Sequence, residues 1–323
     1  MTHNYSEFKC PELGSEFQKE FTRQLKTNFE SIHLNMKRIL VPTDFSEFSY
    51  FAAEVAAGIA KRTEARVYLL HALDMPHYTS NDQFGAFGDT AEGLFLMKRA
   101  KMEFEKLIKQ EFFTDVNVVE VVQWENVFET ITVKAKEHDI DLIVMGSHGA
   151  SGVKEFFVGS NTEKIVRTAH CPVLTIKERM DNFSPKRMVF ASNFFGESAD
   201  SFEPIKRFAE IFDVELHLLK VITPSNFEST EYSHSLMDDF AKETGLSKYK
   251  THTYNEMIVE NGIFSFCENV GADLIAIETH GRTGLAHFFR QSISEDIANH
   301  SPMPVLTVKM VEQSAKKGAI FPD

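Results

Sequence analysis

The second half of this 323-residue chain repeats the first, and the repeat constrains the fold more than any other feature of the sequence. Residues 273–281 (DLIAIETHG) align with residues 141–149 (DLIVMGSHG), and the two copies stay in register from there onward. Further upstream, residues 187–194 (RMVFASNF) align with residues 38–45 (RILVPTDF). The sequence therefore predicts one fold written twice.

Within the first copy, apolar strand patterns alternate with amphipathic helical patterns. Such an alternation predicts right-handed crossovers and a parallel sheet covered by helices on both faces. We therefore expect an α/β protein of two tandem doubly wound, Rossmann-like domains. The first predicted strand begins at Met36 and ends at the turn at 42–46, and the others lie at 65–72, 116–123, 141–145 and 173–177. The predicted helices begin at Ser46, 91, 127 and Ser160, with the second ending at 111.

The repeat also predicts the domain boundaries. We expect a first domain at 36–178, a second at 186–310, a linker rich in polar residues between them, and a tail at 311–323. Residues 1–35 form an N-terminal extension whose apolar residues recur at three- and four-residue steps from Phe17, which indicates an amphipathic helix. The strand pattern starts abruptly at Met36. Residues 1–35 could therefore be either an appendage to the first domain or a stretch upstream of the native start.

Composition excludes several classes of function. Lys+Arg 34 against Asp+Glu 47 gives a net charge of -13, which argues against non-specific binding to nucleic acid or to anionic membranes. No run approaches the roughly 20 apolar residues that span a bilayer, and the first thirty residues lack the apolar core typical of a signal peptide, so we expect a cytoplasmic protein. The three cysteines and thirteen histidines lack metal-ligand spacing, so we expect free thiols and no metal site.

The segment after the strand at 141–145 is the candidate ligand site. Gly146 and Gly149 follow the strand, and Gly159 and Ser160 precede a helical pattern. Glycines let backbone N–H groups approach a ligand, and a helix N-terminus favours an anion, so this loop suits a phosphate. A purely structural reading stands beside it, because Ser160 and Glu163 form a capping box and Gly149 suits a turn.

Differences between the copies separate the needs of the fold from those of a ligand. The capping Ser and Glu occur in both copies, which makes them structural. A carboxylate or a bulkier side chain in the second copy would obstruct a triphosphate, so we place the nucleotide in the first copy only. The differing pairs are Gly146 and Glu278, Gly159 and Gln291, and Asp44 and Asn193. The second loop also carries Arg282, His287 and Arg290, which form either a solvated basic face or a site for another anion.

These motifs closely resemble those of the ATP-binding universal stress proteins. The resemblance rests on a glycine motif in which Gly146-x-x-Gly149 is followed, after nine residues, by Gly159-Ser160. It also rests on the turn at 42–46 and the strand end at 69–72. The two copies cover about 36–310. It implies an open five-stranded parallel sheet in each domain, with the last strands pairing between domains or protomers.

The resemblance also implies a site for ATP, with magnesium bridging the phosphates. Asp44, after Pro42 and Thr43 in the same turn, would contact the ribose, and the backbone around Ala72 and Met145 would lie near the adenine. The phosphates would lie against Gly146, Gly149, Gly159, Ser160 and Asn161.

Three functional hypotheses follow. The first is an ATP-binding stress-response or regulatory protein that acts on an unidentified protein partner. The second is a slow ATPase, although no P-loop lysine is present and His148, the nearest candidate base, is repeated as His280; we assign no catalytic residue. The third is a nucleotide-independent scaffold or apolar-ligand binder. The two copies would form an internal pseudo-dimer, either as a monomeric chain or within a homodimer.

Overall fold

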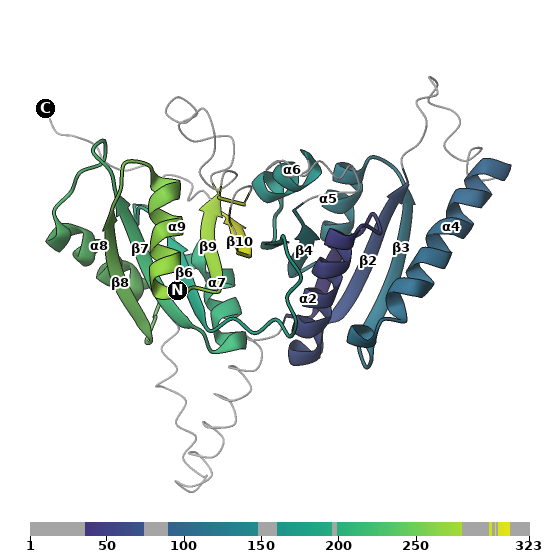
Figure 1. Cartoon of the computed structure of the whole chain (residues 1–323), viewed down its shortest axis with the longest axis horizontal. Helices are drawn as coiled ribbons and strands as arrows, with labels where there is room; N and C mark the ends of the chain where they lie inside the picture. Colours follow the sequence, from purple (N-terminus) through teal and green to yellow (C-terminus); the bar gives the residue numbers. More distant parts are fainter. Residues whose placement is uncertain are drawn as a thin grey trace, which may run out of the picture. The chain divides into compact units, whose positions relative to one another are not determined.

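The computed structural model shows an α/β protein in which strands and helices alternate along the chain (Figure 1). It describes residues 36–73, 90–147, 160–195, 199–279, 297–298, 301 and 303–310. The predictions for the N-terminal extension, the C-terminal tail, Gly149 and Gly159 concern residues outside these ranges.

The first five strands form a parallel sheet in the order β3-β2-β1-β4-β5. Three of its strands are short and almost completely buried, as expected for a sheet covered on both faces. Its elements are β1 (Arg38–Pro42), α2 (Glu47–Thr63), β2 (Arg66–Leu73), α4 (Ala91–Ile108), β3 (Asn117–Trp124), α5 (Val127–Glu137), β4 (Leu142–Gly146), α6 (Ser160–Thr168) and β5 (Val173–Ile176).

The second half forms the same parallel arrangement in the order β10-β9-β6-β7-β8. Together with the first half, it confirms the predicted fold of two open five-stranded sheets. The elements are β6 (Arg187–Ala191), α7 (Ala199–Phe212), β7 (Glu215–Ile222), α8 (Thr230–Glu243), β8 (Tyr249–Asn255), α9 (Val259–Val270), β9 (Leu274–Thr279) and β10 (Val305–Lys309).

The two halves join through their last strands. β5 and β10 pair antiparallel, with Leu174 opposite Leu306, so that the ten strands form one continuous sheet. The hydroxyl groups of Thr175 and Thr307 each donate a hydrogen bond across this junction, to the carbonyls of Val305 (3.3 Å) and Val173 (3.2 Å). The expected pairing through the last strands is therefore present within the chain.

Equivalent contacts confirm the repeat at atomic detail. The Asp141 carboxylate accepts hydrogen bonds from the backbone N–H groups of Lys37 (2.8 Å) and Arg38 (2.9 Å). Asp273 accepts from the N–H groups of Lys186 (2.7 Å) and Arg187 (2.9 Å) in the same way. The aspartate that begins each DLI motif thus fixes the start of a neighbouring strand, which explains its presence in both copies.

Apolar clusters fill both faces of the sheet. One cluster contains buried side chains of α2, α4, α7 and α8, and it runs through both halves. The other face carries one cluster under α5 and α6 and another under α9. The buried phenylalanines are ordinary core residues, as expected, and are Phe104, Phe113, Phe183, Phe190, Phe194, Phe202, Phe208, Phe212, Phe240 and Phe266.

Several predicted boundaries differ from the structure, those of the strands by one or two residues and the end of one helix by three. The helix expected at 91–111 ends at Ile108, and a short 3-10 turn (η2, Glu111–Phe113) follows it. This turn buries Phe113 in the core beside α2, so tertiary packing decides the end of the helix. The strand expected at 116–123 runs from Asn117 to Trp124, and α6 begins at Ser160 as predicted.

Candidate functional site

The turn after β1 carries three of the predicted site residues. Pro42 ends the strand, and the buried Thr43 donates its backbone N–H to the carbonyl of Leu70 on β2 (2.8 Å). The exposed Asp44 accepts hydrogen bonds at Oδ1 from the backbone N–H of Ser46 (3.0 Å) and from its hydroxyl (2.5 Å). Ser46 in turn caps the N-terminus of α2. Asp44 therefore helps to build the turn that presents it.

The second copy builds the same turn from different residues. Asn193 Oδ1 accepts from the N–H of Phe195 (2.8 Å), as Asp44 does from Ser46. Phe194 has a φ of 59° and Phe45 a φ of 61°, and these residues directly follow Asn193 and Asp44. The change from Asp44 to Asn193 preserves the turn and removes a negative charge from its exposed side. This position therefore changes the charge at the sheet edge between the two domains without changing the turn.

His71 links the end of β2 to this turn. Its ring Nδ1 lies 2.8 Å from the carbonyl oxygen of Thr43, and its ring packs against Phe45 with centroids 4.5 Å apart. The following residue, Ala72, is half-buried in β2. This arrangement brings the predicted adenine-side residue Ala72 beside the turn that carries Asp44. The sequence motif at 69–72 includes His71, but its role was not predicted.

Met145 and Gly146 form the end of β4, next to β1. Met145 is buried, and a Cβ atom on Gly146 would lie 2.9 Å from the backbone of Phe48 in the first turn of α2. Glycine is thus required here for the close approach of helix and strand, in addition to any role at a ligand. Sequence reasoning gave only the second explanation.

The N-terminus of α6 lies against the end of β4. The buried Thr162 donates its hydroxyl to the carbonyl oxygen of Gly146 (3.2 Å), which ties the first turn of α6 to the strand end. Asn161 is half-buried at the same turn. The first backbone N–H groups of an α-helix have no partner within the helix, so they can donate to an anion. Sequence reasoning missed Thr162, which only the contact with Gly146 identifies.

The ends of β1, β2 and β4 and the start of α6 therefore meet at one edge of the first parallel sheet. Ligands of doubly wound proteins bind beyond the carboxyl ends of the strands, where the strand order reverses. In the order β3-β2-β1-β4-β5, this reversal falls between β1 and β4. Seven of the predicted site residues lie at this edge, in the strand ends, in the turn after β1 or in the first turn of α6. They are Pro42, Thr43, Asp44, Ala72, Met145, Gly146 and Asn161. Ser160 contributes the first residue of the helix.

A polar cavity of about 420 Å³ lies elsewhere, against the linker residues 178–185. Asp273, Met303 and Lys177 also line it, and burial lowers the pKa of Lys177 to about 8. No strand end of the first sheet other than that of β5 contributes to this cavity. It is therefore separate from the candidate nucleotide site.

The remaining chemistry of the described residues is limited. Among them, no group of three His, Cys, Asp or Glu side chains is placed to hold a metal ion. Cys171 and Cys267 are free and buried, and burial raises the pKa of each thiol to about 12, so neither is a reactive thiolate. Within the same residues, no helix has the length and apolar character needed to cross a membrane.

The fold and the site together define a tandem α/β protein with a candidate ligand-binding edge in its first domain. The chain belongs to the universal stress protein family, whose model matches residues 35–177 and 185–309.

Similar proteins are consistent with this family. A universal stress protein of Methanocaldococcus jannaschii is 31% identical over 150 residues, which is 44% of this chain and 82% of that protein. A second protein of the same organism is 30% identical over 156 residues, or 44% of this chain and 96% of that protein. Nearly the whole of this second relative thus corresponds to less than half of the chain, as expected for a tandem member.

Solved structures share the fold over most of the chain. A universal stress protein of Archaeoglobus fulgidus matches 86% of this chain and 97% of its own, with a TM-score of 0.64 and 19% identity. A functionally unknown protein of Pseudomonas aeruginosa matches 87% and 95%, with a TM-score of 0.58 and 18% identity. At these identities the likeness supports the tandem fold and not a ligand.

Proposed function

We propose that this chain binds one ATP at the carboxyl edge of its first domain and acts as a stress-response or regulatory protein. The observation that carries the proposal is the meeting of the Asp44 turn, the ends of β2 and β4 and the first turn of α6 at one sheet edge. Family membership supports it, because the same chain contains the glycine loop that resembles the ATP-binding members.

The residues at this edge suit the parts of a nucleotide. The Asp44 carboxylate is exposed and can accept hydrogen bonds from ribose hydroxyls. The N-terminus of α6 offers backbone donors and a positive dipole end to phosphate oxygens. Magnesium would then be held by the phosphates, which is its usual arrangement at nucleotide sites. In this proposal the first domain's residues bind and orient the nucleotide, and occupancy biases a surface that a protein partner recognises.

The test is the number of ATP molecules bound per chain. Isothermal titration of the full chain with ATP and magnesium should give about one site. Gly159→Gln introduces the residue of the second copy into the first, and we expect it to weaken binding by at least about tenfold, equivalent to about 1.4 kcal/mol. The matched control is Gln291→Gly, which should leave one site per chain. A count of zero or two for the unaltered chain would refute the proposal.

A further inference from the structure

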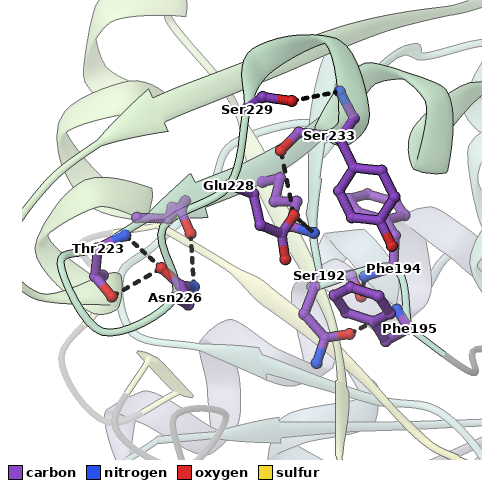
Figure 2. A network of polar contacts seen from close by, with 12 residues as sticks. Ser192, Phe194, Phe195, Thr223, Asn226, Glu228, Ser229 and Ser233 are labelled. Atoms are coloured by element: carbon purple, nitrogen blue, oxygen red, sulfur yellow. Dashed lines mark hydrogen bonds and ion pairs between the residues drawn. The ribbon is translucent and has the colours of Figure 1, made fainter.

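A buried ion pair lies at the ligand edge of the second domain. Lys220 Nζ donates to Glu228 Oε2 at 2.7 Å, and the two side chains are only 2% and 18% exposed. The lysine ammonium also lies 4.4 Å from the centre of the ring of Phe195, a residue of the turn after β6. Ser233 on α8 donates its hydroxyl to the same carboxylate oxygen, at 3.4 Å (Figure 2).

The strand registers give the position of Lys220 in the repeat. Arg38 pairs with Arg66 in the first domain as Arg187 pairs with Glu215 in the second. Arg66 and Glu215 are therefore equivalent, and His71 lies as far along β2 from Arg66 as Lys220 lies along β7 from Glu215. Lys220 thus takes the place of His71. In the first domain the ring of His71 bonds to the Thr43 carbonyl, beside the candidate nucleotide site. The second domain therefore carries a buried cation at the equivalent point.

The carboxylate partner comes from the connection between β7 and α8, and local contacts hold that connection in place. Asn226 Oδ1 accepts hydrogen bonds from the backbone N–H and the hydroxyl of Thr223, and its Nδ2 donates to the Val221 carbonyl. Ser229 then caps α8 by accepting from the N–H of Tyr232 (3.2 Å). Glu228 is thus fixed between a closed turn and a helix cap (Figure 2).

The fold itself does not require this pair. Burying two charges has a large desolvation cost, and their mutual attraction offsets it only in good geometry. At the same strand position the first domain uses a histidine that contacts a backbone carbonyl. The pair is therefore particular to the second domain, at the sheet edge where proteins of this architecture bind ligands.

We propose that Glu228 closes the ligand site of the second domain from within, and that Lys220 is the anion-binding residue of that site. The tethered carboxylate takes the place that a phosphate or carboxylate group of a ligand would take. The domain as it stands then binds no nucleotide, and removing the carboxylate opens a site for a small anion.

Thermal unfolding of the full chain with inorganic phosphate tests this proposal. Glu228→Ala should melt at a lower temperature than the unaltered chain, and phosphate should raise its melting temperature with a saturable dose dependence. Potassium chloride at the same ionic strength should not do so, which separates binding from charge screening. Lys220→Met combined with Glu228→Ala should respond to phosphate no more than the unaltered chain, because the cation is gone.

The matched control is Asp239→Asn, which removes the carboxylate of an ion pair with Lys242 on α8. Both side chains of this pair are exposed, Asp239 to 70% and Lys242 to 74%. This variant should respond to phosphate no more than the unaltered chain. An equal response of Glu228→Ala and the double variant would overturn the proposal. So would a Glu228→Ala chain that fails to fold in both phosphate and chloride, since phosphate should replace the missing carboxylate. Neither result depends on ATP binding in the first domain.

Discussion

At the scale of single residues, Gly146 is a packing residue at a position that we also propose for the ligand site. A Cβ atom here would meet the backbone of Phe48 at 2.9 Å, and a backbone cannot move aside as a flexible side chain can. The glycine therefore sets how closely α2 approaches β4. This closeness in turn determines where the Asp44 turn, which precedes α2, lies relative to the strand end.

We predict that Gly146→Val destabilises the protein by about 1–3 kcal/mol, the usual cost of overpacking. Gly58→Ala is the matched control, because it lies within α2 and a Cβ atom there meets nothing within 4 Å. That change should stabilise the protein by about 0.5–1 kcal/mol, since alanine favours the helix over glycine. Urea unfolding of both variants checks the prediction. Equal stabilities would show that the backbone of α2 moves away without cost.

The site residues show what sequence can reveal at this scale. Comparing the copies predicted a ligand role for Asp44, Gly146 and Gly159, because the residue types at these positions differ between the two copies. The second role of Gly146 was not visible, since it depends on the distance between a helix and a strand. The same is true of Thr162, whose hydroxyl reaches Gly146 only after α6 has packed.

At the scale of elements, strands β7 and β8 carry a stacked pair of histidines under α9. His217 and His252 have ring centroids 5.0 Å apart and an angle of 11° between ring planes, and Phe266 of α9 packs against His252. Burial lowers the pKa of both imidazoles. Nearby charges adjust these pKa values: His217, Lys250 and His234 lower that of His252 further, Lys250 and Arg187 lower that of His217, and Glu215 raises both.

We predict that this pair makes the protein less stable in acid. Both folded pKa values lie below the ordinary histidine value of about 6.5, so the unfolded chain binds protons first as the pH falls. The free energy of unfolding should therefore decrease as the pH falls below about 6.5, until the folded pKa values are passed. Urea unfolding between pH 8 and pH 5 measures this slope.

The control for the acid effect comes from the first domain. At the same register it carries Tyr68 and Val121 in place of the two histidines. The variant His217→Tyr with His252→Val should unfold with a smaller pH dependence than the unaltered chain. An unchanged slope would assign the acid sensitivity to other groups.

The elements themselves were predictable because their signals are local. Period-two and unbroken apolar runs indicated the strands, and Ser160 marked the start of α6. The end of α4 was not predictable, since Phe113 enters the core beyond it through a short turn. The side chains of Lys220 and Glu228 were likewise not paired from sequence, because eight positions and a turn separate them.

At the scale of the whole molecule, the two halves pack against each other in addition to pairing through β5 and β10. The apolar cluster on one face runs from α2 to α7, and the Arg62 guanidinium lies 5.0 Å from the centre of the Phe212 ring. Arg62 also donates to the carbonyl of Ile211 (3.3 Å). These contacts lead us to expect that the halves unfold together.

Trp124, the single tryptophan, reports on the first half, because it lies at the end of β3. Phe190→Ala removes a fully buried ring of the second half that contacts Phe194, Phe202 and Phe240, at a cost of about 3–5 kcal/mol. We predict that it lowers the melting temperature reported by Trp124 fluorescence. Phe227→Ala, at an 82% exposed site, should not. A Trp124 transition unmoved by Phe190→Ala would mean that the halves unfold independently.

The antiparallel junction of β5 and β10 has a consequence for how the halves can diverge. When two such domains pair as separate, identical chains, a substitution changes both members of the pair. Within one polypeptide, the first half always has the second as its neighbour, at an effective concentration that dilution cannot change. A substitution such as Lys220 in place of histidine therefore changes only one of the two domains joined by β5 and β10, and the tether permits lasting inequality between two copies of one fold.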